Sequence, residues 1–231
     1  MSRRPDIAIA LDLPSAAAAL ALVDAVGGGA DWYKVGSVLF VREGPALVRE
    51  LVARGKSVFL DLKWHDIPSV AAGAAEAAAA LGCALATVHL AGGRAMLEAA
   101  VRAREGTGLR LLGVGVLTSM GATEYGAVVA REVAEVGDEQ ERMVRAALTA
   151  GLDGFVTAVT EAARLRRVVG PEALLVAPGI RRARDAAADQ HRTAVPAQAV
   201  SAGVDLLVVG RPVTGATDPG EAVRAIRQEM G

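Results

Sequence analysis

The chain has 231 residues, of which 52% are hydrophobic, and this length and composition fit one domain with a sizeable core. Its formal net charge is -1, and charged residues of both signs are spread along the chain, which excludes a basic nucleic-acid-binding stripe and a disordered acidic tail. No apolar run approaches the roughly 18 residues of a membrane span, and Asp6 and Asp12 interrupt what would be the apolar region of a signal peptide. We therefore expect a cytoplasmic protein that binds a small molecule, and neither nucleic acid nor a membrane.

Short aliphatic or β-branched runs alternate with longer, Ala-rich helical segments along the chain. The runs predicted as strands are 7–11, 32–35, 57–62, 85–89, 109–116, 154–158, 173–177 and 205–209. The segments between them, such as 14–26 and 93–105, are rich in Ala and Leu, and many are followed by Gly, as helices often are. Eight strands alternating with helices predict a single-domain (β/α)8 TIM barrel over residues 1–231, with a doubly wound open sheet as the alternative.

Two further segments carry local predictions. The connection 121–144, after the fifth predicted strand, is long, and it predicts a short additional helix or a mobile element. The single cysteine, Cys83, has no partner for an internal disulfide, which fits a reducing cytosol. Because Cys83 lies in the apolar run LGCALATVHL, we expect it to be a buried packing residue.

Charged side chains gather where the first three predicted strands end. Asp12 follows the first strand, the second ends with Lys34, and the third runs into Asp61, Lys63 and Asp66. The carboxyl ends of barrel strands meet at one rim, where catalytic groups of such enzymes sit. Asp61 and Lys63 are two residues apart, so on a regular strand their side chains point to the same face.

Lys34, Asp61, Lys63 and Asp66 alternate in sign and can keep one another ionised in a partly buried site. For any single pair, a structural ion pair that closes the barrel end is an equal alternative. For the whole set, which converges from two strands and a loop, a catalytic array is the better interpretation.

The loops after the last two strands have the composition of a phosphate site. They read PGIR over 178–181 and VGRP over 209–212. In barrels of this kind these two loops often bind phosphate with backbone N–H groups. Glycine allows the backbone to approach the anion, and Arg181 and Arg211 can make bidentate contacts with it.

The three histidines are His65, His89 and His191, and no two of them have the spacing of a metal-ligand pair. His65 lies between Lys63 and Asp66, which suggests an acid or a ligand. We instead expect His65 to make structural hydrogen bonds.

Over essentially its whole length the sequence resembles the orotidine 5′-phosphate decarboxylase family. The motifs that carry the resemblance, in the family's order, are ALDLP, YKVG, DLKWHDIP, VLTSM, PGIR, ADQHR, VPAQ and VVGRPVT. DLKWHDIP is the most specific of them. The resemblance implies conversion of orotidine 5′-phosphate to UMP, the last step of UMP biosynthesis, by a homodimer without a metal or an organic cofactor.

Carried over residue by residue, the resemblance implies a catalytic array of Lys34, Asp61, Lys63 and Asp66, with Lys63 as the proton donor. Asp66, with Ile67, would reach the site of the neighbouring subunit. The substrate-binding residues would be Asp12, Thr118, Ser119, Pro178, Arg181, Gln190, Gly210 and Arg211.

Five of these substrate-binding residues have implied roles of their own. Asp12 would hold ribose hydroxyls and Ser119 the pyrimidine edge. Gln190 and Arg211 would hold the phosphate, helped by the backbone of Gly210. One departure from the family pattern is Val70, which stands where a threonine usually contributes a hydroxyl to the ribose region.

Two rival functions remain open from the sequence. Sister phosphosugar decarboxylases and aldolases share the barrel and a similar Asp-x-Lys-x-x-Asp motif, but they use Mg2+ and have a carboxylate at the end of the second strand, where this chain has Lys34. A phosphate-binding barrel without catalysis would account for Arg211 but not for the charges around Lys63.

Overall fold

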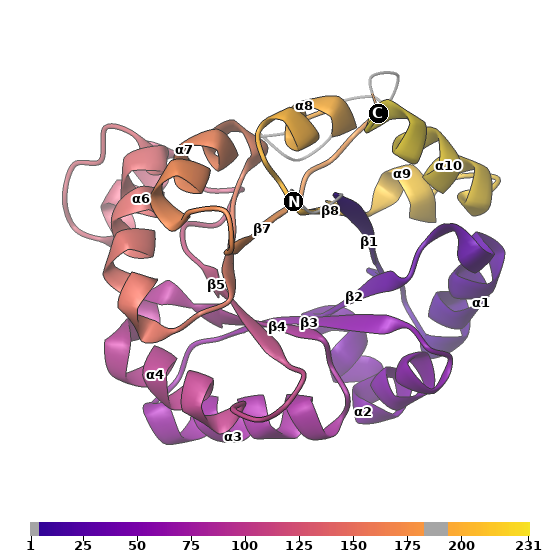
Figure 1. The fold of residues 1–231 in the computed structure, drawn as a ribbon, viewed down its shortest axis with the longest axis horizontal. Helices are drawn as coiled ribbons and strands as arrows, with labels where there is room; N and C mark the ends of the chain where they lie inside the picture. The colour runs from indigo at the N-terminus through magenta and orange to yellow at the C-terminus, as the bar shows by residue number, and fades with distance from the viewer. Residues whose placement is uncertain (1–4, 183–193) are drawn as a thin grey trace.

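Eight parallel strands form a closed barrel in which each strand pairs with the next and β8 pairs with β1. The computed structural model describes residues 5–182 and 194–231. The strands are β1 (Asp6–Ala10), β2 (Trp32–Gly36), β3 (Ser57–Trp64), β4 (Leu85–His89), β5 (Arg110–Val114), β6 (Gly154–Val156), β7 (Leu174–Ala177) and β8 (Leu206–Val209). Helices surround the barrel on its outer side (Figure 1). The predicted (β/α)8 TIM barrel is confirmed, and the open-sheet alternative is wrong.

The helices follow the strands in the order that the Ala-rich segments predict. They are α1 (Ala16–Val26), α2 (Ser37–Ala53), α3 (Pro68–Ala80), α4 (Gly93–Ala103), α5 (Ala122–Val128), α6 (Val136–Ala147), α7 (Val159–Val169), α8 (Pro196–Ser201), α9 (Arg211–Thr214) and α10 (Pro219–Glu229). Single 3-10 turns are η1 (Gly27–Gly29), η2 (Leu90–Gly92) and η3 (Leu148–Ala150). Among the described residues, no helix has the length and apolar character of a membrane span.

Alternation along each strand divides the core into two parts. One set of side chains fills the inside of the barrel: Ala8, Ala10, Phe59, Leu85, Leu112, Leu174, Val176, Leu206 and Val208. The other set, which includes Ile7 and Ile9, packs between the barrel and the helices. Burying one such aliphatic side chain contributes about 1.5–3 kcal/mol, so these two layers fix the barrel that carries the site.

Cys83 is 3% exposed and belongs to the outer layer, just before β4. Burial raises the pKa of its thiol to about 11. The expectation of a buried packing residue is confirmed.

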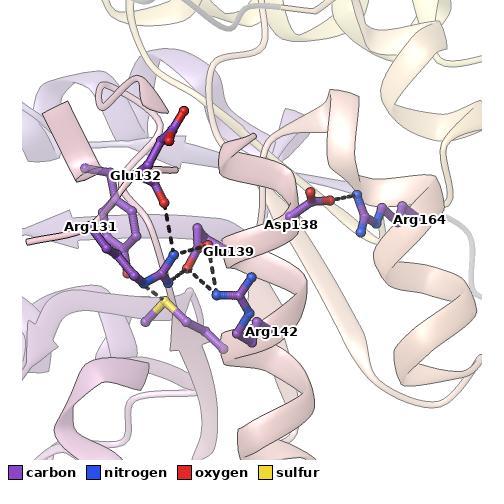
Figure 2. A network of polar contacts seen from close by, with 8 residues as sticks. Arg131, Glu132, Asp138, Glu139, Arg142 and Arg164 are labelled. Carbon is purple, nitrogen blue, oxygen red and sulfur yellow. Dashed lines mark hydrogen bonds and ion pairs between the residues drawn. The ribbon is translucent and has the colours of Figure 1, made fainter. Parts of the chain in front are cut away.

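The long connection after β5 contains the short helix α5 and leads into α6, which confirms the predicted additional helix. The carboxylate of Glu139, on α6, is almost fully buried and accepts two hydrogen bonds from the guanidinium of Arg131, while Arg142 lies 3.0 Å away on its other side (Figure 2). The hydrogen bonds from Arg131 lower the pKa of Glu139. The chain between α5 and α6 is therefore tied to α6 by a charged contact.

Candidate active site

Two lysines and two aspartates lie together at the carboxyl ends of β1, β2 and β3. Lys34 Nζ lies 3.2 Å from Asp12 Oδ1 and 3.6 Å from Asp61 Oδ2. Lys63 Nζ lies 2.8 Å from Asp61 Oδ1. Each charge therefore has a partner of opposite sign, as ionised groups in a partly buried site require.

The side chain of Lys34 fits into this cluster because the nearby residue 36 is a glycine and has no side chain. Lys34 is 9% exposed, so its ammonium depends on the two carboxylates for its charge partners. A Cβ atom at Gly36 would lie 3.1 Å from Lys34 Nζ and 3.2 Å from Asp12 Oδ1. The lack of a side chain at Gly36 thus leaves space for the ion pair between Lys34 and Asp12.

Asp61 and Lys63 meet through an irregular part of β3. Residues 61–63 lie opposite the single β4 residue Thr87, because the register shifts there. Lys63 has φ 51°, in the left-handed region that costs a residue with a side chain roughly 1–2 kcal/mol. The two side chains do meet as expected, but regular strand alternation is the wrong reason.

Thr87 is a residue that none of the motifs singles out. It is fully buried, its Oγ1 accepts a hydrogen bond from the Lys63 backbone N–H at 2.9 Å, and its hydroxyl donates to Asp61 Oδ1 at 3.0 Å. The one available signal is a polar residue inside the apolar run LATVH.

A cavity of about 300 Å3 opens beside the charged cluster. The cluster forms one wall with Asp12, Lys34, Asp61 and Lys63. Segments after the later strands contribute Thr118, Pro178, Gly179, Ile180, Arg181, Gly210, Arg211 and Thr214, and strand residues contribute Ala10, Phe59, Val156, Val176 and Val208. Nine of the predicted site residues therefore line one cavity: Asp12, Lys34, Asp61, Lys63, Thr118, Pro178, Arg181, Gly210 and Arg211.

The loop after β7 is shaped by its own backbone contacts. Gly179 has φ 81°, a conformation that favours glycine. The Arg181 N–H donates to the Ala194 carbonyl at 3.0 Å, and the Ala194 N–H donates to the Gly179 carbonyl at 3.3 Å. These bonds hold residues 179–181 against the cavity, next to Gly210 and Arg211 at the end of β8.

Of the described residues in the predicted site, three do not line this cavity. Ser119 lies on a separate surface groove beside α5 and the start of α6. Asp66 and Ile67 are exposed just before α3, where Asp66 Oδ1 accepts a hydrogen bond from the Ile67 N–H at 2.7 Å. Gln190 lies outside the described residues.

The rings of His65 and His89 stack with their centroids 5.1 Å apart, close to the charged cluster. Burial lowers the pKa of His89, and the nearby His65 and Lys63 lower it further. His89 Nδ1 accepts a hydrogen bond from the Ala91 N–H at 3.2 Å, which is a structural role. Over residues 5–182 and 194–231, no three His, Cys, Asp or Glu side chains are grouped so as to hold a metal ion.

The sequence model of the Orotidine 5′-phosphate decarboxylase / HUMPS family matches residues 5–226. This chain belongs to that family. A relative from Anaeromyxobacter sp. (strain K), named orotidine 5′-phosphate decarboxylase, is 50% identical over 220 residues, which cover 95% of this chain and 96% of the relative. Another of that name, from Halorhodospira halophila (strain DSM 244 / SL1), is 47% identical over 232 residues, covering 98% of this chain and 96% of the relative.

The fold agrees with the family assignment. The crystal structure of orotidine 5′-phosphate decarboxylase from Lactobacillus acidophilus matches with a TM-score of 0.86 and 31% sequence identity over 99% of each chain. The resemblance drawn from the motifs is therefore confirmed, and so is the expectation that the protein is an enzyme of the carboxy-lyase class.

Proposed function

We propose that this protein decarboxylates orotidine 5′-phosphate to UMP, the last step of de novo pyrimidine biosynthesis, in the cytoplasm and without a metal. The observation that supports this most is the position of the Asp61–Lys63 pair, which faces a cavity whose other wall carries Arg181 and Arg211. A substrate with a reacting carboxylate at one end and a phosphate at the other fits this division of charge.

In the proposed reaction Lys63 both stabilises charge and supplies the proton. Loss of CO2 from C6 of the pyrimidine leaves a carbanion with no adjacent carbonyl to accept the charge. An ammonium group held beside C6 lowers the energy of this anion and then protonates it. Asp61, 2.8 Å from Lys63 Nζ, holds the ammonium in place, and Lys34 keeps Asp61 from carrying an uncompensated charge.

The phosphate would bind at the far wall of the cavity, where Arg211 and Arg181 supply positive charge and Gly210 and Pro178 bring the backbone close. Gln190 belongs to this proposed phosphate site through the family motif. Asp12 would bind the ribose, and Thr118 and Ser119 the pyrimidine. Ser119 must then turn from its surface groove toward the cavity, which is part of the proposal.

The absence of a metal requirement is proposed from the position of Lys34. Its ammonium stands 3.2 Å from the Asp12 carboxylate and 3.6 Å from the Asp61 carboxylate, so it already supplies positive charge to the two groups that would otherwise be available to hold a divalent cation. The positive charge at this point is therefore supplied by the chain itself, unlike in the Mg2+-using sister enzymes of the family.

We also propose a homodimer in which Asp66 and Ile67 enter the neighbouring site. Both residues are exposed, and large apolar side chains are exposed on the same rim: Val38 and Val41 on α2, Ile67 before α3, and Val70 on α3. Val41 is 83% exposed and Ile67 62%, which are high values for aliphatic side chains. In this arrangement Val70 would add apolar contact where relatives have a threonine.

An absorbance assay for conversion of orotidine 5′-phosphate to UMP tests the proposal directly. We expect turnover that survives exhaustive treatment with EDTA. Loss of activity in EDTA with recovery in Mg2+ would assign the protein to the metal-using branch. Binding of phosphate compounds without any turnover would instead favour a binding protein.

A further inference from the structure

The bulge in β3 is held from one side by a single hydroxyl group. Residues 61–63 lie opposite Thr87 alone, and the Thr87 hydroxyl contacts both ends of this stretch. It accepts from the Lys63 N–H at 2.9 Å and donates to Asp61 Oδ1 at 3.0 Å. The same Asp61 oxygen receives Lys63 Nζ at 2.8 Å, so the three residues form a closed triangle of hydrogen bonds.

The position of the hydroxyl is itself fixed. Thr87 is fully buried in the middle of β4, and its β-branched side chain restricts rotation about χ1. Thr87 is not among the residues that line the cavity. Thr87 is linked to the cavity by its hydrogen bonds to Asp61 and Lys63, which both line it.

The backbone of Lys63 requires such support. Its φ of 51° is unfavourable for a residue with a side chain, and such a conformation persists where the surroundings determine it. Removal of the Thr87 hydroxyl would leave the Lys63 N–H without its acceptor and would remove one hydrogen-bond donor from Asp61. Both changes would let the ammonium of Lys63 move away from the cavity.

We propose that Thr87 is a positioning residue for decarboxylation, which fixes the Asp61 carboxylate and the left-handed backbone of Lys63 through one hydroxyl group. This inference rests on the proposed function, because it assigns Lys63 as the proton donor. Thr87 acts on the rate of the chemical step and leaves the phosphate-binding loops unchanged.

The test compares Thr87→Val, which keeps the shape and removes the hydroxyl, with Thr87→Ser, which keeps the hydroxyl. We expect kcat of Thr87→Val to fall about 100-fold, the scale of a small misplacement of a reacting group, with KM within about threefold of wild type. Thr87→Ser should recover kcat to within about fivefold of wild type. Thr87→Ala makes the same comparison should the valine variant not fold.

A matched control is Thr157→Val, since Thr157 is also buried but its hydroxyl donates to the Ala158 carbonyl, at 3.2 Å, and to no catalytic group among the described residues. We expect the control to keep the wild-type kcat. Unchanged kcat in Thr87→Val, or an equal loss in Thr157→Val, would overturn the proposal.

Hydrogen exchange gives a readout that does not depend on activity. The Lys63 amide should exchange about tenfold faster in Thr87→Val than in wild type or Thr87→Ser, because only the valine variant lacks its acceptor. Equal exchange in all three proteins would overturn the positioning role. If wild type does not turn over orotidine 5′-phosphate, the proposed function fails, and the exchange result alone then decides whether Thr87 holds the bulge.

Discussion

At the scale of single residues, the charged cluster is better explained by chemistry than by stability. A buried ion pair often contributes little net stability, whereas removing one partner leaves a charge uncompensated, at a cost of about 3–5 kcal/mol. Lys63 also has a strained backbone, and it lines a cavity together with Lys34 and Asp61. Stability of this end of the barrel would not by itself require a charged cluster with a strained backbone beside a cavity.

We expect Lys63→Ala to lower turnover of orotidine 5′-phosphate by several orders of magnitude, because the proton donor and the stabilising charge are lost together. The variant should still bind UMP, since the proposed phosphate loops lie on the opposite wall of the cavity. Kinetics and calorimetric titration with UMP measure the two effects. Retention of more than a few per cent of the activity would leave Lys63 without its proposed role.

Arg211→Ala should act on binding instead. Loss of a charge-assisted contact to phosphate is expected to weaken UMP binding by about 2–4 kcal/mol. The nucleoside uridine, which has no phosphate, serves as the control ligand and should bind both proteins equally. An equal loss for nucleoside and nucleotide would contradict the assignment of Arg211 to the phosphate.

At the scale of elements, α6 fixes the ends of two neighbouring strands. Gln140, which is almost fully buried, accepts from the Val116 N–H at 2.9 Å and donates to the Val156 carbonyl at 3.0 Å. Gly115 makes room for it, because a Cβ there would lie 2.2 Å from Gln140 Oε1. The segment that leads to Thr118 is thereby held to β6.

Gln140→Leu should therefore destabilise the protein, because one buried and one partly buried backbone group lose their partner, at about 1–3 kcal/mol for the buried one. Urea unfolding should show a lower midpoint with an unchanged m-value. Arg145→Gln, at a side chain that is 58% exposed on the same helix, is the control and should shift the midpoint little. A change below about 0.5 kcal/mol in Gln140→Leu would show that this side chain is not required to join the strands.

At the scale of the whole molecule, the proposed dimer divides each site between two chains. Lys63 lines the cavity of its own chain, whereas Asp66 is exposed on the same rim and does not reach that cavity. A twofold interface is isologous, so each site would take Lys63 from one chain and Asp66 from the other.

Mixing inactive Lys63→Ala chains with inactive Asp66→Ala chains should then restore activity. In a mixed dimer one site carries both changes and the other carries none. Random exchange makes about half of the dimers mixed, which gives about a quarter of wild-type activity if the sites are independent. If a tag pull-down shows that subunits exchanged and the mixture is still inactive, Asp66 acts within its own chain.

The sequence predicts the barrel well because strands that are buried on both faces form continuous aliphatic runs bounded by polar rims. It also places the charged residues near Lys63 together, since parallel strands share one carboxyl end. It does not predict the bulge or the role of Thr87, because both depend on how β3 pairs with a strand 24 residues further along the chain. The position of Ser119 likewise depends on how α5 and α6 pack, which no local pattern specifies.

Because Cys83 is buried, the reaction of its thiol can be used to measure how often the folded chain opens. Thiol reagents react with the thiolate, and in the native barrel the thiol is both covered and held at a pKa of about 11. Unfolding exposes it and returns its pKa to the ordinary range of a free thiol, so at mildly alkaline pH the open chain reacts and the closed chain does not. Because the sequence contains one cysteine, each labelled chain records one opening event near β4, and the labelling rate measures that equilibrium without substrate and without an engineered label.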